Sequence, residues 1–249
     1  MADETWGQAL RRLGSAQKGH ARGAPAYSVY VNRRVGRVLA ATAYVMGLTP
    51  NGVTAVSAVF TFTGIILLVA VPTAPWLGIV VALLLALGYA WDSADGQLAR
   101  LQGGGTIAGE WLDHFVDAIK IATLHLAVLV GLFRFTDISA GWLLVPLGFS
   151  VVATVSFFGT LLNDLLKGAR GVASSQARGG GTALRSLVLV PTDYGLLCLV
   201  FVLWGWPTLF LAVYALLGVA CTAFLALAAV KWFREMRRID APVTAGGAS

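Results

Sequence analysis

The chain has 249 residues, of which 57% are hydrophobic and only 12% are charged, and its formal net charge is +6. A soluble domain of this length carries about 25% charged residues. The composition therefore excludes a soluble all-α enzyme and favours a membrane protein with several spans, whose exterior is lipid. The excess of positive charge is explained by the Lys and Arg residues that cytoplasmic loops accumulate, so no nucleic-acid partner is expected.

The chain begins with residues 1–24, which are polar, basic and rich in small side chains, and we expect a flexible cytoplasmic tail here. Residues 28–46 differ, because one face of their helical wheel is apolar and the other is basic. The apolar face carries Val31, Val35, Val38 and Val45, and the opposite side carries Arg33 and Arg37. This pattern predicts an amphipathic helix in the membrane interface, with its arginines near anionic headgroups. The alternative is a linker that is merely basic.

Six apolar segments follow, each of roughly the length that a membrane-spanning helix needs. They cover about residues 51–71, 75–101, 107–133, 139–163, 184–203 and 207–233. The first begins at TPNGVT, where Thr49 or Asn51 can cap a helix and Pro50 suits its first turn. The predicted fold is an all-α integral membrane protein, with an interfacial helix and six transmembrane helices in one domain of residues 25–235. A flexible cytoplasmic tail is expected over residues 236–249.

The positions of the 18 Lys and Arg residues predict how the spans are oriented. Apart from Arg134, they lie before the first span, at or near the turn between the second and third, around the loop between the fourth and fifth, or after the sixth. Because cytoplasmic loops are enriched in Lys and Arg, we place both termini and these two loops in the cytoplasm. We expect the membrane to be the bacterial cytoplasmic membrane.

Four aspartates collect where the second span ends and the third begins. Asp92 and Asp95 are three residues apart, and Asp113 and Asp117 are four apart, so each pair shares one face of a helix; Lys120 continues the second face. The glycine-rich turn between them, residues 101–108, is short, and it predicts that the two helices pack as antiparallel neighbours. All four carboxylates would then meet at the cytoplasmic face.

Carboxylates this close repel one another, and divalent cations would relieve that repulsion. Oxygen ligands favour hard ions such as Mg²⁺ or Mn²⁺, with Ca²⁺ as a substitute. Two such ions would suit phosphoryl transfer, because they neutralise phosphate oxygens. One alternative is that the charges merely lie among lipid headgroups. Another is a cation-coupled membrane transporter, which the absence of a second acidic group in an inverted repeat disfavours.

The spacing of these residues resembles the signature of the CDP-alcohol phosphotransferase family, D-x2-D-G-x2-A-R-x8-G-x3-D-x3-D. Every fixed position matches: Asp92, Asp95, Gly96, Ala99, Arg100, Gly109, Asp113 and Asp117. The wider likeness covers roughly residues 28–235, including a P-N-x-x-T start to the first span. The resemblance implies an enzyme that cleaves the pyrophosphate of a CDP-linked donor, transfers its phosphoalcohol portion to an acceptor hydroxyl and releases CMP. It also implies a homodimer in a membrane that makes phospholipids or related phosphodiesters.

The resemblance also implies roles for individual residues. Asp92, Asp95 and Asp113 would hold two divalent metal ions, with Asp117 close enough to ligate one of them. Asp117 is also the position of the general base, and a carboxylate there can take a proton from an incoming hydroxyl. The CDP portion would lie against four residues: Gly96, Ala99, Arg100 and Gly109. The donor could be CDP-diacylglycerol or another CDP-alcohol.

The acceptor is less well specified by the sequence. Lys120, on the aspartate face, and Asp193, inside the fifth span, are candidate acceptor contacts, because charges within a span need partners. Four basic residues around the loop between the fourth and fifth spans could bind a phosphorylated acceptor, or could simply set topology: Lys167, Arg170, Arg178 and Arg185. The fourth span has no basic residue in its interior, which disfavours inositol phosphate as the acceptor.

Overall fold

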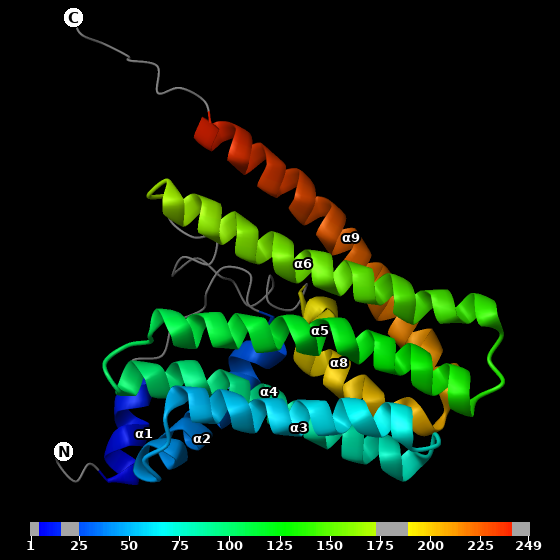
Figure 1. Cartoon of the computed structure of the whole chain (residues 1–249), viewed down its shortest axis with the longest axis horizontal. Coiled ribbons are helices and arrows are strands. Elements are labelled where there is room, and N and C mark those ends of the chain that lie inside the picture. The colour runs from blue at the N-terminus through cyan, green and yellow to red at the C-terminus, as the bar shows by residue number, and fades with distance from the viewer. Residues whose placement is uncertain (1–4, 16–24, 173–188, 241–249) are drawn as a thin grey trace, which may run out of the picture.

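The structure, a computed structural model, describes residues 5–15, 25–172 and 189–240. Within these ranges every regular element is helical, as the composition and periodicity predicted. The α-helices are α1 (Trp6–Ser15), α2 (Arg33–Val45), α3 (Pro50–Ala70), α4 (Pro75–Leu101), α5 (Ile107–Phe135), α6 (Leu144–Ala169), α8 (Tyr194–Val200) and α9 (Pro207–Asp240) (Figure 1). A π-helical turn (Ser28–Asn32) precedes α2, and 3-10 turns occur at Ala140–Leu143, Val190–Thr192 and Phe201–Gly205.

Five helices in the described ranges are long and apolar enough to cross a membrane. They are α3, α4, α5, α6 with the turn before it, and α9, and each corresponds to one predicted span. The last helix is longer than expected, because it continues to Asp240 through residues predicted to begin the C-terminal tail. Figure 1 shows α3, α4 and α5 running alongside one another, with α6 and α9 leaning away from them toward their C-terminal ends.

The predicted span over residues 184–203 has a different form in the structure. Its first residues, 184–188, lie outside the described ranges, and the described apolar helix runs only from Tyr194 to Gly205. At 1.5–2 Å per residue this stretch measures roughly 20 Å, less than the ~30 Å of a bilayer core. Asp193 begins the helix by accepting a hydrogen bond from Gly195 N (3.0 Å), and Pro207 starts the next helix. A sixth complete span therefore stays a prediction.

Local sequence rules account for the helix ends that frame the site. Thr49 Oγ1 accepts a hydrogen bond from Gly52 N (3.1 Å), with Pro50 in the first turn of α3. Thr106 caps α5 in the same way. Between α4 and α5, Gly103 and Gly104 have φ angles of 100° and 130°. Glycine adopts these angles without the strain that a side chain would bring, so the turn can reverse the chain within a few residues.

Small residues bring α4 into close contact with α2 and α3. A Cβ atom on Gly88 would lie 2.1 Å from Thr61 Oγ1 of α3, and one on Gly36 of α2 would lie 2.9 Å from Ser93 of α4. Helices in membranes associate through such close packing, because lipid provides no hydrophobic driving force. The acidic end of α4 is therefore fixed between α2 and α3.

The N-terminal segment corrects one expectation. Residues 6–15 lie within the predicted flexible tail, yet they form α1, with Ala9 and Leu13 buried against α2 and α4. Trp6 Nε1 donates to Thr42 Oγ1 (3.2 Å), and the Arg12 guanidinium donates to the carbonyl of Leu101. The two buried residues are four apart, so the segment carries a short apolar face, and tertiary packing stabilises a helix that would be too short to persist alone.

The region predicted as an interfacial helix is helical from the π-helical turn to Val45. Its protein-facing side carries small residues, Gly36, Ala40, Ala41 and Ala43. The four valines of the predicted apolar face lie on the other side and are exposed, with exposed fractions from 42% for Val31 to 55% for Val45. An exposed apolar stripe is suited to lipid contact, although a position in the membrane interface stays a prediction.

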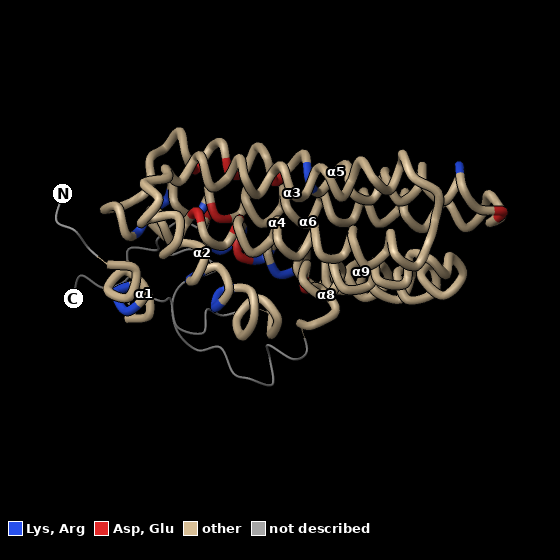
Figure 2. The backbone as a smooth tube through the Cα atoms, turned by 90° about the horizontal axis from the view of Figure 1, so that it is seen from below, with Lys and Arg blue, Asp and Glu red and all other residues tan. Residues whose placement is uncertain are grey.

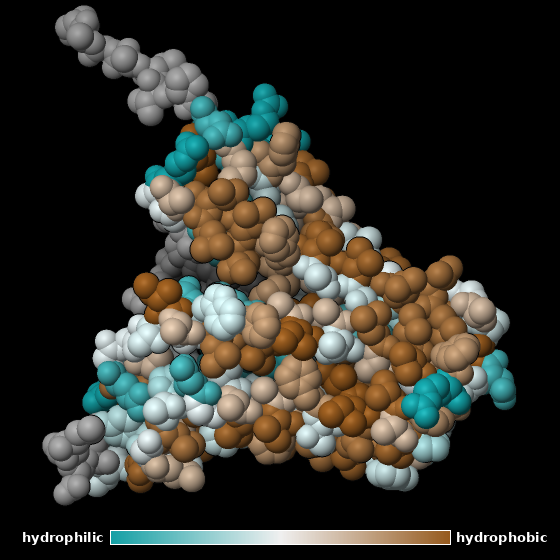
Figure 3. All heavy atoms as spheres, in the orientation of Figure 1, coloured by the Kyte–Doolittle hydropathy of each residue, from teal (hydrophilic) through white to brown (hydrophobic). Residues whose placement is uncertain are grey.

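The surface separates apolar from charged regions. Apolar side chains cover much of the face seen in Figure 3, while polar ones gather where α6 and α9 end. The backbone view in Figure 2 shows most described charges toward one end of the bundle, where the aspartates of α4 and α5 lie. The structure thus brings the predicted acidic residues together at one end of the spanning helices.

Candidate functional site

Three carboxylates meet between the C-terminal turns of α4 and the N-terminal turns of α5. Each of Asp92, Asp95 and Asp113 offers one oxygen, and these oxygens all lie within 4.8 Å of one another. Asp113 Oδ1 is buried and has no hydrogen-bond partner among the described residues. A buried carboxylate oxygen without a partner is costly. The three side chains therefore fit a hard divalent cation, which binds carboxylate oxygens.

A hydroxyl of α3 holds Asp95 in place. Thr54 Oγ1 donates to Asp95 Oδ2 (2.7 Å), and Gly96 N donates to Asp95 Oδ1 (2.5 Å). Thr54 is buried, so this hydrogen bond is shielded from water. Sequence reasoning did not assign Thr54 to the site. The signal that could have found it is the last position of the P-N-x-x-T start to α3.

Lys120 lies between Asp92 and Asp117 and binds both. Its ammonium donates to Asp92 Oδ1 (2.5 Å), to Asp117 Oδ1 (3.1 Å) and to Ser57 Oγ (3.1 Å). These bonds use all three donors of the ammonium group. Ser57 in turn donates to the carbonyl of Gly88 (2.9 Å), which anchors the group to α4. Asp117 thus stands beside the three carboxylates, linked to Asp92 through Lys120.

A cavity of about 170 Å³ opens next to this lysine. Its lining comes from α3, α4, α5 and α8: Thr61, Tyr89, Asp92, Asp117, Lys120, Ile121 and Tyr194. The rings of Tyr89 and Tyr194 meet edge to face with centroids 5.1 Å apart. The Tyr194 hydroxyl is buried and has no hydrogen-bond partner among the described residues. Neither tyrosine was predicted as a site residue. Tyr194 in particular reaches the cavity only because α8 packs beside α4, which the sequence pattern does not show.

The four residues predicted to contact CDP lie on the more open side of the same helix ends. Gly96 and Ala99 are half-buried and Arg100 is exposed. A Cβ atom on Gly96 would lie 3.7 Å from Arg100 Nη1, and one on Gly109 would lie 3.1 Å from Asn51 Oδ1. Because these two glycines have no side chain, they leave space beside the carboxylates, which a bulky nucleotide would require.

Asp193 does not line the cavity. It is buried, and its oxygens accept hydrogen bonds from Gly195 N and from Ser28 N, each at 3.0 Å. In this arrangement Asp193 joins the start of α8 to the turn before α2. Of the predicted basic residues near the acceptor, Lys167 pairs with Glu235 (2.7 Å). Arg178 and Arg185 lie outside the described residues.

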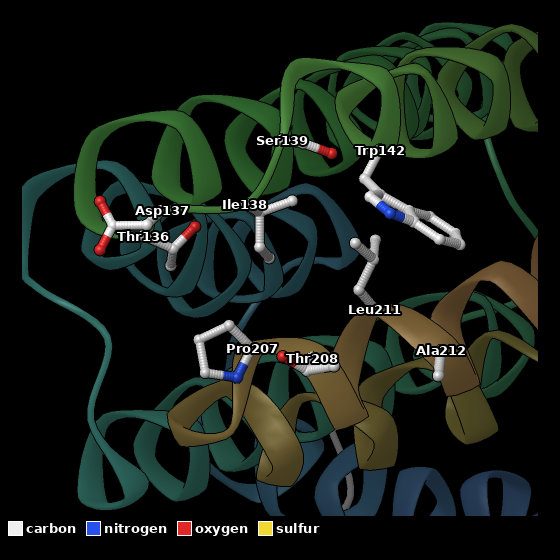
Figure 4. Close-up of a pocket in the computed structure, with 9 residues that line it drawn as sticks. All are labelled: Thr136, Asp137, Ile138, Ser139, Trp142, Pro207, Thr208, Leu211 and Ala212. Atoms are coloured by element: carbon white, nitrogen blue, oxygen red, sulfur yellow. The ribbon is translucent and has the colours of Figure 1, made fainter.

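A larger cavity, about 590 Å³, lies at the opposite end of the bundle between the α5–α6 connection and the start of α9 (Figure 4). Its lining is Thr136, Asp137, Ile138, Ser139, Trp142, Pro207, Thr208, Leu211 and Ala212. Only one of these residues is charged, and none belongs to the predicted site. We therefore locate the chemistry at the smaller cavity, because the convergent carboxylates and lysine are there.

The chain is similar to known proteins in both sequence and structure. The model of the CDP-alcohol phosphatidyltransferase family matches residues 47–230, which include all eight motif positions and exclude α1 and α2. Two similar solved structures are of the phosphatidylinositol phosphate synthase of Mycobacterium tuberculosis. The structure with manganese and citrate has a TM-score of 0.52 and 22% identity, covering 78% of this chain and 87% of that one. The structure with CDP-DAG bound has a TM-score of 0.51 and 21% identity, covering 79% and 90%. No curated protein matches the sequence.

Proposed function

The chain belongs to the CDP-alcohol phosphatidyltransferase family and is a phosphotransferase, and from this premise we propose its reaction. In this proposal an integral membrane enzyme transfers the phosphoalcohol group of a CDP-linked donor to an acceptor hydroxyl and releases CMP, with a requirement for divalent metal ions. The observation that carries the proposal is the convergence of three carboxylates within 4.8 Å at the ends of α4 and α5.

The metal-binding residues in this proposal are Asp92, Asp95 and Asp113, with Asp117 near enough to contribute. Two ions, Mg²⁺ or Mn²⁺, would neutralise the oxygens of the donor pyrophosphate. The orphaned Asp113 Oδ1 supports this assignment, since a bound cation would satisfy it. The related mycobacterial synthase was crystallised with manganese, which supports the choice of metal.

The proton of the acceptor hydroxyl goes to Asp117. One carboxylate oxygen, Oδ1, already accepts from Lys120, so the hydroxyl would approach the other oxygen. As Asp117 takes the proton, the acceptor oxygen bonds to the phosphorus of the phosphoalcohol group, and CMP leaves with the electrons of the broken P–O bond. Arg100, Gly96, Ala99 and Gly109 would hold the CDP portion.

The membrane setting extends the proposal. The excess of Lys and Arg at the aspartate end favours a cytoplasmic site in a bacterial cytoplasmic membrane, with both termini on that side. CDP-DAG bound in the related synthase supports a CDP-linked lipid donor. A homodimer, which the family resemblance implies, is part of the same proposal. The transporter alternative is not favoured, because the family is one of enzymes.

Purified protein should test the proposal directly. CMP release would be measured with CDP-diacylglycerol or a soluble CDP-alcohol, a panel of hydroxyl acceptors, and Mg²⁺, Mn²⁺ or EDTA. We expect CMP only when donor, acceptor and metal are all present. Asp117→Asn should lower the rate about 10²- to 10⁴-fold, the usual contribution of a general base, while Mn²⁺ still binds. Cation movement across vesicles without any CMP release would instead support a transporter.

A further inference from the structure

Lys120 places a positive charge among the carboxylates that are proposed to hold metal ions. Its side chain is only 7% exposed, and its ammonium lies 2.5 Å from Asp92 Oδ1 and 3.1 Å from Asp117 Oδ1. Asp92 is one of the three carboxylates that converge, and Asp117 is the fourth carboxylate of the motif. A metal ion that binds either of these two oxygens must share it with the ammonium or displace the ammonium from it.

The four carboxylates differ in the kind of hydrogen-bond donor that they meet. Asp95 accepts from two neutral donors, a threonine hydroxyl and a backbone amide. Asp113 Oδ1 is buried and has no hydrogen-bond partner in the part of the chain that the structure describes. An ion held by these two residues and Asp92 would meet the ammonium at one carboxylate. An ion held by Asp92 and Asp117 would meet it at both, so the two ions of the proposed centre are not equivalent.

The surroundings of Lys120 hold its ammonium in this position. Ser57 Oγ accepts a hydrogen bond from it over 3.1 Å, and Ser57 is fully buried. The same hydroxyl donates to the carbonyl of Gly88 (2.9 Å), which fixes its direction. With the two carboxylates, Ser57 satisfies all three donors of the ammonium. To leave this position the side chain must give up three hydrogen bonds, two of them to charged groups, and such bonds are the stronger kind.

An ammonium group and a divalent ion that share the same oxygens repel each other, and the repulsion is stronger inside a protein than in water. Resting on the two metal ions of the proposed function, we propose that Lys120 is a positioning residue that controls the second ion. One ion binds tightly at the three convergent carboxylates, and the second binds weakly until the CDP-linked donor is present. The phosphate oxygens of the donor are ligands for a hard divalent ion and acceptors for an ammonium, so the donor supplies oxygens to both cations.

Binding of Mn²⁺ tests this role without any turnover. The purified protein would be titrated with Mn²⁺ in the absence of donor and acceptor, and free Mn²⁺ would be followed by electron paramagnetic resonance. We expect the parent protein to bind one ion tightly and a second at least tenfold more weakly. Lys120→Met keeps the length of the side chain and removes its charge, so it should tighten the second ion at least tenfold, the usual effect of one hydrogen bond to a charged group. CDP-diacylglycerol should tighten the second ion in the parent by a similar factor, and by less in Lys120→Met.

Lys167→Met is the matched control, because Lys167 is also 7% exposed and pairs with a carboxylate, Glu235, over 2.7 Å between α6 and α9. This variant should leave both Mn²⁺ affinities unchanged. If Lys120→Met does not fold, Ser57→Ala gives a second reading, since it loosens the ammonium without removing its charge and should tighten the second ion several-fold.

The outcomes separate this inference from the proposed function. Two ions of equal affinity in the parent, an unchanged or weaker second ion in Lys120→Met, or the same change in Lys167→Met would overturn the role of Lys120. Metal-dependent release of CMP by the parent would still support the proposed function in each of these cases. If the parent bound no Mn²⁺ and released no CMP, the proposed function would fail and the inference with it.

Discussion

Thr54 orients Asp95, and the substitution Thr54→Val removes that support without changing the shape of the side chain. The hydrogen bond runs from Thr54 Oγ1 to Asp95 Oδ2 over 2.7 Å, and both residues are buried. A hydrogen bond to a charged group contributes about 1.5–3 kcal/mol. The Gly96 amide still holds the other oxygen of Asp95, so the carboxylate should remain in place but turn more freely.

This loss should appear as weaker metal binding. Since about 1.4 kcal/mol corresponds to a factor of ten, the expected decrease in affinity is roughly 10- to 100-fold, the range found for partners that support metal ligands. The assay is a Mn²⁺ titration, followed both by the rate of CMP release and by electron paramagnetic resonance of free Mn²⁺. The second readout does not depend on turnover.

Thr63→Val is a matched control on the same helix. Thr63 is exposed, and its hydroxyl donates to the carbonyl of Val59 within α3 (2.7 Å), so its loss should leave Mn²⁺ binding unchanged. Thr54→Ser keeps the donor and should stay close to the parent protein. If Thr54→Val bound Mn²⁺ within twofold of the parent, Thr54 would not orient a metal ligand and the reasoning would be wrong.

Three further variants probe the packing around the site. Lys120→Met leaves the carboxylates of Asp92 and Asp117 without their buried cation. In EDTA this should lower the free energy of unfolding by about 3 kcal/mol, and Mn²⁺ should restore part of the loss; thermal unfolding measures both. Lys231 is exposed, so Lys231→Met should hardly change the unfolding midpoint. If both lysine variants lowered the midpoint equally, the buried contacts of Lys120 would not explain its effect. Gly88→Ala places a Cβ atom 2.1 Å from a hydroxyl of α3 and should destabilise by about 1–3 kcal/mol, unlike Gly148→Ala, which has open space. Arg12→Ala removes a hydrogen bond to the end of α4, so hydrogen exchange in α1 should become about tenfold faster; unchanged exchange would mean that Arg12 does not hold α1 in place.

The sequence could predict those parts of the site that depend on the spacing of residues within one helix. Asp92 and Asp95 share a face because they are three residues apart, and Asp113 and Asp117 because they are four apart. The prediction that the glycine-rich turn packs the two helices as direct neighbours is wrong, because α3 packs against both α4 and α5 while these two helices hardly contact each other. Three of the four carboxylates nevertheless converge within 4.8 Å. The family match over residues 47–230 confirms the resemblance drawn from the same eight positions.

Partners that are distant in the chain could not be predicted in this way. Thr54 is 41 residues from Asp95, and Ser57 is 63 residues from Lys120. Their contacts depend on how deeply α3 packs against α4 and α5, which in turn depends on close approaches such as Gly88 against Thr61. Nothing in the local pattern fixes that depth.

By itself, then, the sequence determined the helical fold, the membrane setting and the acidic residues, because these follow from composition and from periodicity within single helices. Only the tertiary structure decided that residues 6–15 form a packed helix and that Asp193 joins α8 to the turn before α2. It also placed the hydroxyl of Tyr194 beside the aspartates. These features arise from packing between helices, where the position of one residue is set by the shapes of many others.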